Sequence, residues 1–341
     1  HPFLSKNDEW AAFEAVTNHP GEKILTNLSG SYVRDAYLQG LTLQDQGKPN
    51  PFNFGVIGSS DTHVGGGSYT EETHFSKIGL LDGEPYLRGS VPFDGIYSLI
   101  ARLWQPDSIL EIDEKNYLSF SPRLIRFGSS GLAGVWAEEN TRESIYNAFR
   151  RKETFGTSGP RIKVRFFAGY NFENSNLNDQ DLIQEAYSKN IPMGGDVIQE
   201  KGKNPRFLVW AISDPLGAPL QRVQIIKGWL ADGEQREKVF DVACSDGQSV
   251  NPLSHRCPDN GAKVNLDDCS ISREKGNAEI KTFWKDPEFS NDQEAFYYAR
   301  VLENPTCRWS TWDAVRAEEK PRSDIPVTIQ ERAWSSPIWI K

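Results

Sequence analysis

The stretch Phe54-Gly-Val-Ile-Gly-Ser-Ser-Asp61-Thr-His63 decides the fold expected for the first part of the chain. It opens with a short apolar run bounded by glycine, a pattern typical of a strand buried on both faces of a parallel sheet. A helical pattern over residues 31–41 precedes it. Because a helix that leads into a buried strand is the repeating unit of α/β proteins, the sequence predicts an α/β arrangement here.

Asp61 and His63 follow this apolar run directly. In an extended chain, side chains two positions apart project to the same side. A carboxylate and an imidazole placed in this way can bind one divalent cation, and barrel enzymes keep their sites at such strand ends. The alternative is a polar loop in which Asp61 accepts backbone hydrogen bonds and His63 binds nothing. The spacing alone leaves both interpretations open.

The hydrophobic pattern changes to strict alternation after residue 160. In Arg161–Phe166, the apolar residues Ile162, Val164 and Phe166 alternate with basic ones, as in a half-exposed strand. Residues 159–341 are therefore predicted to form a β-sandwich, with a domain boundary near residues 158–160, whereas residues 65–134 predict an irregular insertion into a first domain of residues 1–158. The further expected strands are Arg206–Ile212, Arg222–Ile226, Lys238–Ala243, Glu279–Trp284, Phe296–Leu302 and Val327–Glu331.

Composition and charge exclude several classes of protein. Of the 341 residues, 38% are hydrophobic and 25% are charged, and the net charge is −9. A protein that binds nucleic acid needs a surplus of Lys and Arg against the phosphates. No run approaches the ~20 consecutive apolar residues of a membrane-spanning helix. We therefore expect a folded protein with no nucleic-acid partner and no membrane span.

The four cysteines are expected to form disulfides. Their spacing lacks the Cys-x-x-Cys pairs that are typical of zinc sites. Four cysteines allow three pairings, and the sequence does not choose among them; the alternative is four reduced, buried thiols. Disulfides persist in oxidising compartments, so they predict a periplasmic or secreted protein. The residues are Cys244, Cys257, Cys269 and Cys307.

Three long motifs together resemble one bacterial family. They are residues 54–63, 131–143 and 151–162, and further matching segments extend to Trp334. The family is uncharacterised, secreted and related to the PHP (polymerase and histidinol phosphatase) metallohydrolases. The resemblance implies that residues 1–158 are the C-terminal portion of a PHP-like distorted (β/α) barrel, followed by the β-sandwich. It also implies a cluster of ligands for divalent metal ions, zinc, manganese or iron, in which Asp61 and His63 match the last ligand pair.

The resemblance implies a metal-dependent hydrolase. Such an enzyme would cut a phosphate ester, or a related ester or amide bond, of a small-molecule substrate through a metal-activated water. These families open with a His-x-His pair, and nothing like it occurs here before residue 54. We therefore expect the remaining ligands on an N-terminal fragment of the same polypeptide. Additional candidates for substrate contacts are His1, His74 and Arg161, although a chain end, a solvated acidic loop and an outward strand residue are the respective alternatives.

Two other functions remain open. The first is a carbohydrate- or ligand-binding or structural β-sandwich, in which aromatic side chains on one sheet face would stack against sugars. The second is an inactive fragment that has the fold but lacks most metal ligands. The tryptophans considered for a sugar platform are Trp210, Trp229, Trp309, Trp312, Trp334 and Trp339.

Overall fold

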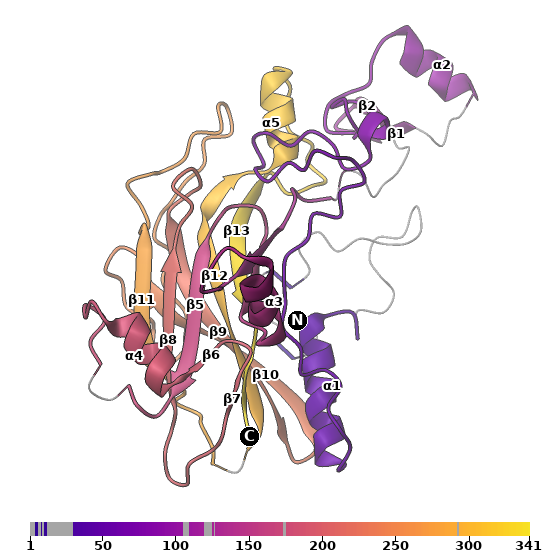
Figure 1. The fold of residues 1–341 in the computed structure, drawn as a ribbon. Helices are drawn as coiled ribbons and strands as arrows, with labels where there is room; N and C mark the ends of the chain where they lie inside the picture. Colours follow the sequence, from indigo (N-terminus) through magenta and orange to yellow (C-terminus); the bar gives the residue numbers. More distant parts are fainter. Residues whose placement is uncertain are drawn as a thin grey trace.

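Two packed β-sheets form the centre of the molecule (Figure 1). The computed structural model describes residues 4–5, 8, 10–11, 30–104, 109–118, 125, 127–172, 175–291 and 293–341. Within these ranges the structure is mixed α/β, with mostly strands and few helices, and the sheets are open. The described residues therefore contain no closed barrel, in contrast to the barrel expected for residues 1–158.

The larger sheet has eight strands. Six of them, in spatial order, are β10 (Glu234–Cys244), β9 (Leu220–Ala231), β12 (Ala295–Cys307), β13 (Thr328–Ser335), β4 (Thr154–Thr157) and β3 (Leu132–Val135). Neighbours in this order pair antiparallel. Two short strands extend the sheet beside β12, namely β14 (Ile338–Ile340), which pairs antiparallel with β12, and β7 (Asp196–Val197), which pairs parallel with β14.

The smaller sheet is antiparallel and covers one face of the larger sheet. Its strands, in spatial order, are β11 (Glu279–Lys285), β8 (Arg206–Ile212), β5 (Lys163–Gly169) and β6 (Ile191–Pro192). Alternating apolar side chains from both sheets fill the space between them, for example Phe166 and Phe207 from the smaller sheet and Ile225 and Val301 from the larger one. The alternation predicted for Ile162, Val164 and Phe166 is confirmed, since all three are buried.

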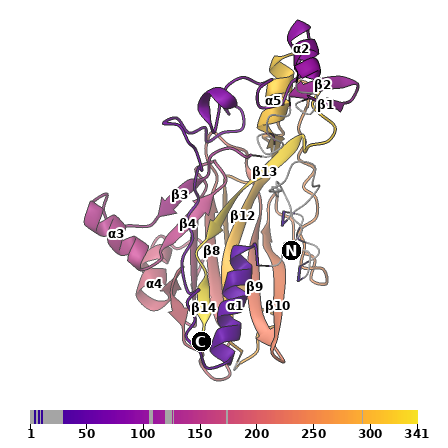
Figure 2. The same cartoon turned by 90° about the vertical axis from the view of Figure 1, so that its right-hand side faces the viewer.

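Helices cover the outer faces of both sheets (Figure 2). Helix α1 (Val33–Asp45) packs Tyr37, Leu38 and Leu41 on the larger sheet, and α4 (Leu182–Lys189) packs on the smaller one. Helix α3 (Arg142–Arg150) begins at Thr141, whose side chain accepts a hydrogen bond from the Ser144 amide. No helix in the described part of the chain combines the length and apolar character needed to cross a bilayer.

A long excursion between α1 and β3 projects from one end of the sheets, as the weak periodicity of residues 65–134 predicts (Figure 1). It carries the 3-10 turn Gly79–Leu81, helix α2 (Ile96–Trp104) and the hairpin of β1 (Ile109–Ile112) and β2 (Lys115–Leu118). Helix α5 (Trp309–Arg316) holds it in place: the buried Arg88 guanidinium donates to both carboxylate oxygens of Asp313 at 2.6 and 2.7 Å.

Two expectations about the first part of the chain differ from the structure. Residues 54–58 form no strand; Phe54 and Ile57 are exposed, and the segment crosses the larger sheet as irregular chain. The sheet also extends across the boundary expected near residue 158, because β3 and β4 precede it and Gly156 of β4 pairs with Trp334 of β13. Short, glycine-containing strands such as β4 carry too little alternation to be recognised in the sequence.

Candidate functional site

Residues 55–60 reach the candidate site by crossing close over β3 and β4. A Cβ atom on Gly58 would lie 2.3 Å from the Leu132 carbonyl oxygen, and one on Gly156 would lie 2.5 Å from the Gly58 nitrogen. Both positions therefore need glycine, because no side chain fits between the two backbones. A hydrogen bond of 2.9 Å from the Val56 amide to the Ser336 hydroxyl fixes the start of the crossing.

The loop that carries Asp61 and His63 is held from two sides. On one side, the His63 amide donates to the Lys77 carbonyl at 2.8 Å and the Lys77 ammonium donates to the Ser60 carbonyl at 2.5 Å. On the other side, the hydroxyls of Thr62 and Ser130 lie 3.2 Å apart and share a hydrogen bond. The loop is therefore a fixed support, although it belongs to no helix or strand.

Asp61 and His63 are both exposed at this loop. Asp61 has a left-handed backbone with φ of 50°, a conformation that Asp adopts more readily than most residues. The His63 Nδ1 atom lies 3.1 Å from the Asp61 carbonyl oxygen. Because a carbonyl only accepts, Nδ1 is the donor in this contact, and in the neutral ring Nε2 then keeps its lone pair. Metal-binding histidines are commonly oriented by such a contact.

The donor set at the loop fits part of a metal site. A carboxylate and a neutral imidazole are ligands that zinc, manganese and iron accept. Within the described residues, however, no three His, Cys, Asp or Glu side chains are grouped so that they could hold a metal ion. Since a divalent ion takes at least four ligands, Asp61 and His63 would supply about half of a site at most.

A buried pair of carboxylates lies beyond this loop, where the excursion meets β13 and α5. Glu71 accepts hydrogen bonds from the Trp309 amide at 2.6 Å and the Ser129 amide at 3.3 Å. Glu331 of β13 accepts from the Ser158 hydroxyl. Burial, and then the charge of Glu71, raise the pKa of Glu331 far above its ordinary value. Glu71 is thus a buried residue that joins the excursion to α5.

The additional candidates lie apart from one another. His74 is 7% exposed and stacks on Trp309, so its position favours packing over a substrate contact. Arg161 is exposed just before β5, where its backbone amide donates to the Asp214 carboxylate at 2.7 Å. His1 lies outside the described residues.

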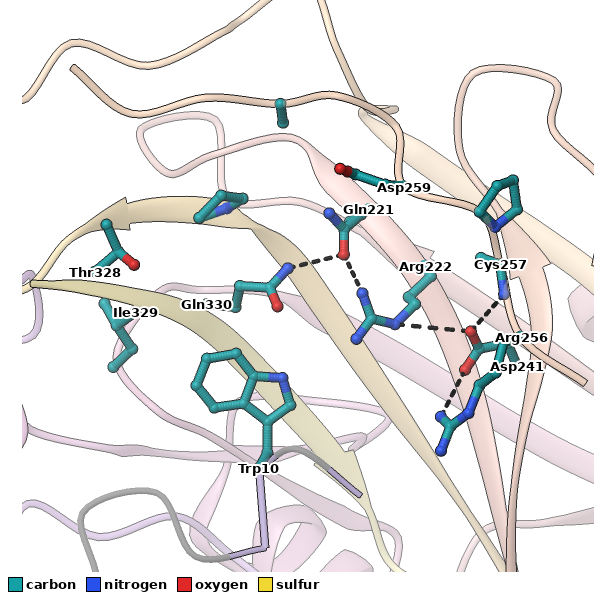
Figure 3. A pocket seen from close by; sticks show the side chains of 13 residues that line it. Trp10, Gln221, Arg222, Asp241, Arg256, Cys257, Asp259, Thr328, Ile329 and Gln330 are labelled. Atoms are coloured by element: carbon teal, nitrogen blue, oxygen red, sulfur yellow. Dashed lines mark hydrogen bonds and ion pairs between the residues drawn. The ribbon is translucent and has the colours of Figure 1, made fainter. Parts of the chain in front are cut away.

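Two pockets open on the outer face of the larger sheet, and Trp10 lines both. The first has a volume of about 440 Å³, and both polar and apolar side chains line it (Figure 3). The second, of about 470 Å³, lies between α1 and the crossing residues 56–58. No pattern in the sequence pointed to the first pocket, because its described lining residues are far apart along the chain. They are Trp10 and residues of β9, β10, the loop after β10, β12 and β13.

The four cysteines form two disulfides, as expected. Cys244 pairs with Cys257, and Cys269 pairs with Cys307. The structure thereby selects one of the three possible pairings. The first disulfide closes the loop beside the first pocket, whose lining includes Cys257. Both fit an oxidising compartment, either extracellular or periplasmic.

Comparison with known protein families gives one match. Residues 1–341 match the family described as "Protein of unknown function (DUF3604)". The chain belongs to this family. Among curated proteins, the search finds no matching relative. This DUF3604 member carries the exposed pair Asp61 and His63 and two pockets on the outer face of the larger sheet.

Proposed function

We propose that this chain is the C-terminal part of a metal-dependent hydrolase, in which Asp61 and His63 bind a divalent ion. The observation that carries the proposal is the contact of 3.1 Å between His63 Nδ1 and the Asp61 backbone carbonyl, which points to Nε2 as the ligand atom of an exposed histidine two residues from the exposed Asp61. The resemblance to PHP-related proteins supports it independently. The remaining ligands would come from an N-terminal fragment of the same polypeptide.

The substrate class follows from the chemistry that such an ion supplies. A bound divalent ion activates water and polarises a phosphoryl or acyl oxygen, so a phosphate ester or a related ester or amide is the expected substrate. The chain's own contribution is placement: Lys77 and Ser130 hold the loop, and the carbonyl of Asp61 orients the His63 ring. The two disulfides support a periplasmic setting for this reaction.

The sugar platform suggested by the tryptophans receives no support from their positions. Trp309 and Trp339 are buried, and Trp210, Trp229, Trp312 and Trp334 are only partly exposed. They belong to both sheets and to α5, so they do not form one exposed row. Their placement is that of core aromatics, which supply much of the buried area of a sandwich.

Metal content and hydrolysis of the complete polypeptide test the proposal. We expect Asp61→Asn and His63→Gln each to lower bound manganese or zinc, measured by mass spectrometry after dialysis, and to abolish hydrolysis of p-nitrophenyl phosphate and p-nitrophenyl acetate. The matched controls are Asp45→Asn, at the exposed end of α1, and His255→Gln, in the loop after β10. Full metal content in both loop variants would overturn the proposal, and the inactive fragment would then be the better account.

A further inference from the structure

The first pocket combines planar polar groups with one aromatic wall (Figure 3). Gln221 and Arg222 come from β9, Asp241 comes from β10 and Gln330 comes from β13, so rigid strands supply its floor. The Trp10 indole lies beside Gln330. Sites built on strands hold their side chains more accurately than sites built on loops.

The charged groups of the pocket compensate one another. Asp241 is buried, and the guanidinium groups of Arg222 and Arg256 approach its two carboxylate oxygens at 3.8 and 3.4 Å. The Cys257 amide also donates to Asp241, at 2.7 Å. Among the described residues that line the pocket, Asp259 supplies a second carboxylate, so two positive side chains accompany two negative ones. An anionic ligand would therefore meet the carboxylate of Asp241 between the two guanidinium groups, which disfavours it.

The amide groups are fixed, yet they retain capacity for a ligand. Gln330 donates to the side-chain oxygen of Gln221 at 2.8 Å and to the Glu303 carbonyl at 3.0 Å. Both donors of the Gln330 amide are therefore engaged, and its orientation is determined. Its side-chain oxygen has no hydrogen bond to any other described residue. The side chains of Arg222 and Arg256, 14% and 26% exposed, also line the pocket, and Nη1 of Arg222 donates to the Gln221 side-chain oxygen.

The Trp10 ring, which forms the aromatic wall, is in cation–π contact with Arg332. The Arg332 guanidinium lies 4.4 Å from the centre of the Trp10 ring and lines the second pocket, not the first. An indole face that borders a polar pocket suits the C–H face of a sugar ring, while amides and guanidinium groups bond its hydroxyls. A volume of about 440 Å³ lies within the usual range for small-ligand sites.

We propose that the pocket between Trp10, Gln330 and the Arg222–Asp241–Arg256 cluster binds a neutral saccharide. The sugar ring stacks on Trp10, and its hydroxyls bond Gln330 and the guanidinium groups. This site stands on residues other than Asp61 and His63, so it does not rest on the proposed hydrolysis. It also differs from the sugar platform considered above, since its aromatic wall is Trp10.

Titration of the disulfide-intact chain with oligosaccharides tests the proposal. The probes are maltotriose, cellotriose, tri-N-acetylchitotriose and mannotriose as neutral sugars, and tri-galacturonate as the anionic one, followed by calorimetry. We expect saturable binding of at least one neutral probe. Gln330→Leu, which keeps the volume but removes the amide, should weaken it by roughly tenfold or more, the loss of one or two hydrogen bonds, and Trp10→Ala should do the same.

The control variant is Trp210→Ala, which removes a partly exposed tryptophan of the smaller sheet that pairs with Lys281 instead. It should bind as the unchanged chain does. Circular dichroism establishes that each variant is folded, and Trp10→Phe replaces Trp10→Ala if the latter is not. Failure of every neutral probe to bind, binding of tri-galacturonate alone, or unchanged affinity in folded Gln330→Leu would each overturn the proposal.

Discussion

His74 and Trp309 stack with ring centroids 4.5 Å apart and planes 21° from parallel. Burial of the imidazole, and then the positive charges of Arg88 and Arg308, lower the pKa of His74 to about 3. In the folded state the ring is therefore neutral at any pH above that value. The stack joins the excursion to α5, so protonation of His74 affects how these two segments pack.

This stack predicts an acid-sensitive stability. The unfolded chain takes up a proton near pH 6.5, whereas folded His74 does so only near pH 3. The free energy of unfolding should therefore fall as pH drops through this window, by up to about 1.4 kcal/mol per pH unit. His74→Phe keeps an aromatic ring there and should flatten this dependence in denaturant unfolding between pH 7 and 4. A pH dependence in the His74→Phe variant that equals that of the parent chain would contradict the assignment.

Glu303 predicts a pH dependence of the opposite sign. It is fully buried on β12, and burial raises the pKa of its carboxyl from 4.5 to about 8. Between these values the unfolded chain is ionised while the folded one keeps its proton. Stability should therefore fall as pH rises through the window, by up to about 1.4 kcal/mol per unit. Glu303→Gln should remove this loss and be the more stable protein at pH 8, whereas the exposed Glu318→Gln should behave like the parent chain. An unaltered pH profile in the Glu303→Gln variant would refute the assignment.

The two disulfides should contribute unequally to stability. Cys269–Cys307 closes a loop of sequence separation 38, and Cys244–Cys257 closes one of 13. The longer loop removes more entropy from the unfolded state. Replacing Cys269 and Cys307 by alanine should therefore lower the free energy of unfolding by about 4 kcal/mol, and replacing Cys244 and Cys257 should lower it by about 3 kcal/mol. Chemical unfolding of the two double variants checks this. A larger loss from the shorter loop would show that contacts around the cysteines, not chain entropy, determine their contribution.

The close crossing at Gly58 predicts a local sensitivity to substitution. Gly58→Ala would place a methyl group 2.3 Å from the Leu132 carbonyl oxygen, so the backbone must shift. We expect a loss of about 1 to 3 kcal/mol and a displaced loop at Asp61 and His63. Gly66→Ala is the matched control, because no atom lies within 4 Å of its Cβ position. Equal stability of the two variants in thermal unfolding would rule out the close packing of this crossing.

The strands of the C-terminal part could be predicted because their signal is local. Arg206–Ile212 is expected and observed with the same bounds, and the expected strands at 238–243 and 296–302 lie inside β10 and β12. Alternation of apolar and polar residues follows directly from a sheet with one buried face. Turn residues between the strands then limit their lengths.

The features that the sequence does not predict depend on contacts between distant parts of the chain. They include the course of residues 54–58, the burial of Glu71 and the pocket at Trp10. The run at Phe54–Gly58 has the composition of a buried strand, yet its glycines serve the crossing over Gly156. Glu71 looks like a surface acid, but it is buried because the Trp309 amide, 238 residues away, donates to it. For the candidate site, the sequence predicts the pair Asp61 and His63, which the structure leaves exposed. The pocket at Trp10 has no sequence signal, since its described lining residues come from six separate segments of the chain.

Nitrogen NMR of His63 in the complete polypeptide, with and without Zn²⁺, tests the metal-binding claim most directly. We expect Nδ1 to keep its proton, as its contact with the Asp61 carbonyl requires, while the Nε2 resonance of His63 shifts when zinc is added and stays unshifted in Asp61→Asn. An Nε2 resonance that does not respond to zinc, or a response at Nδ1 in its place, would contradict it.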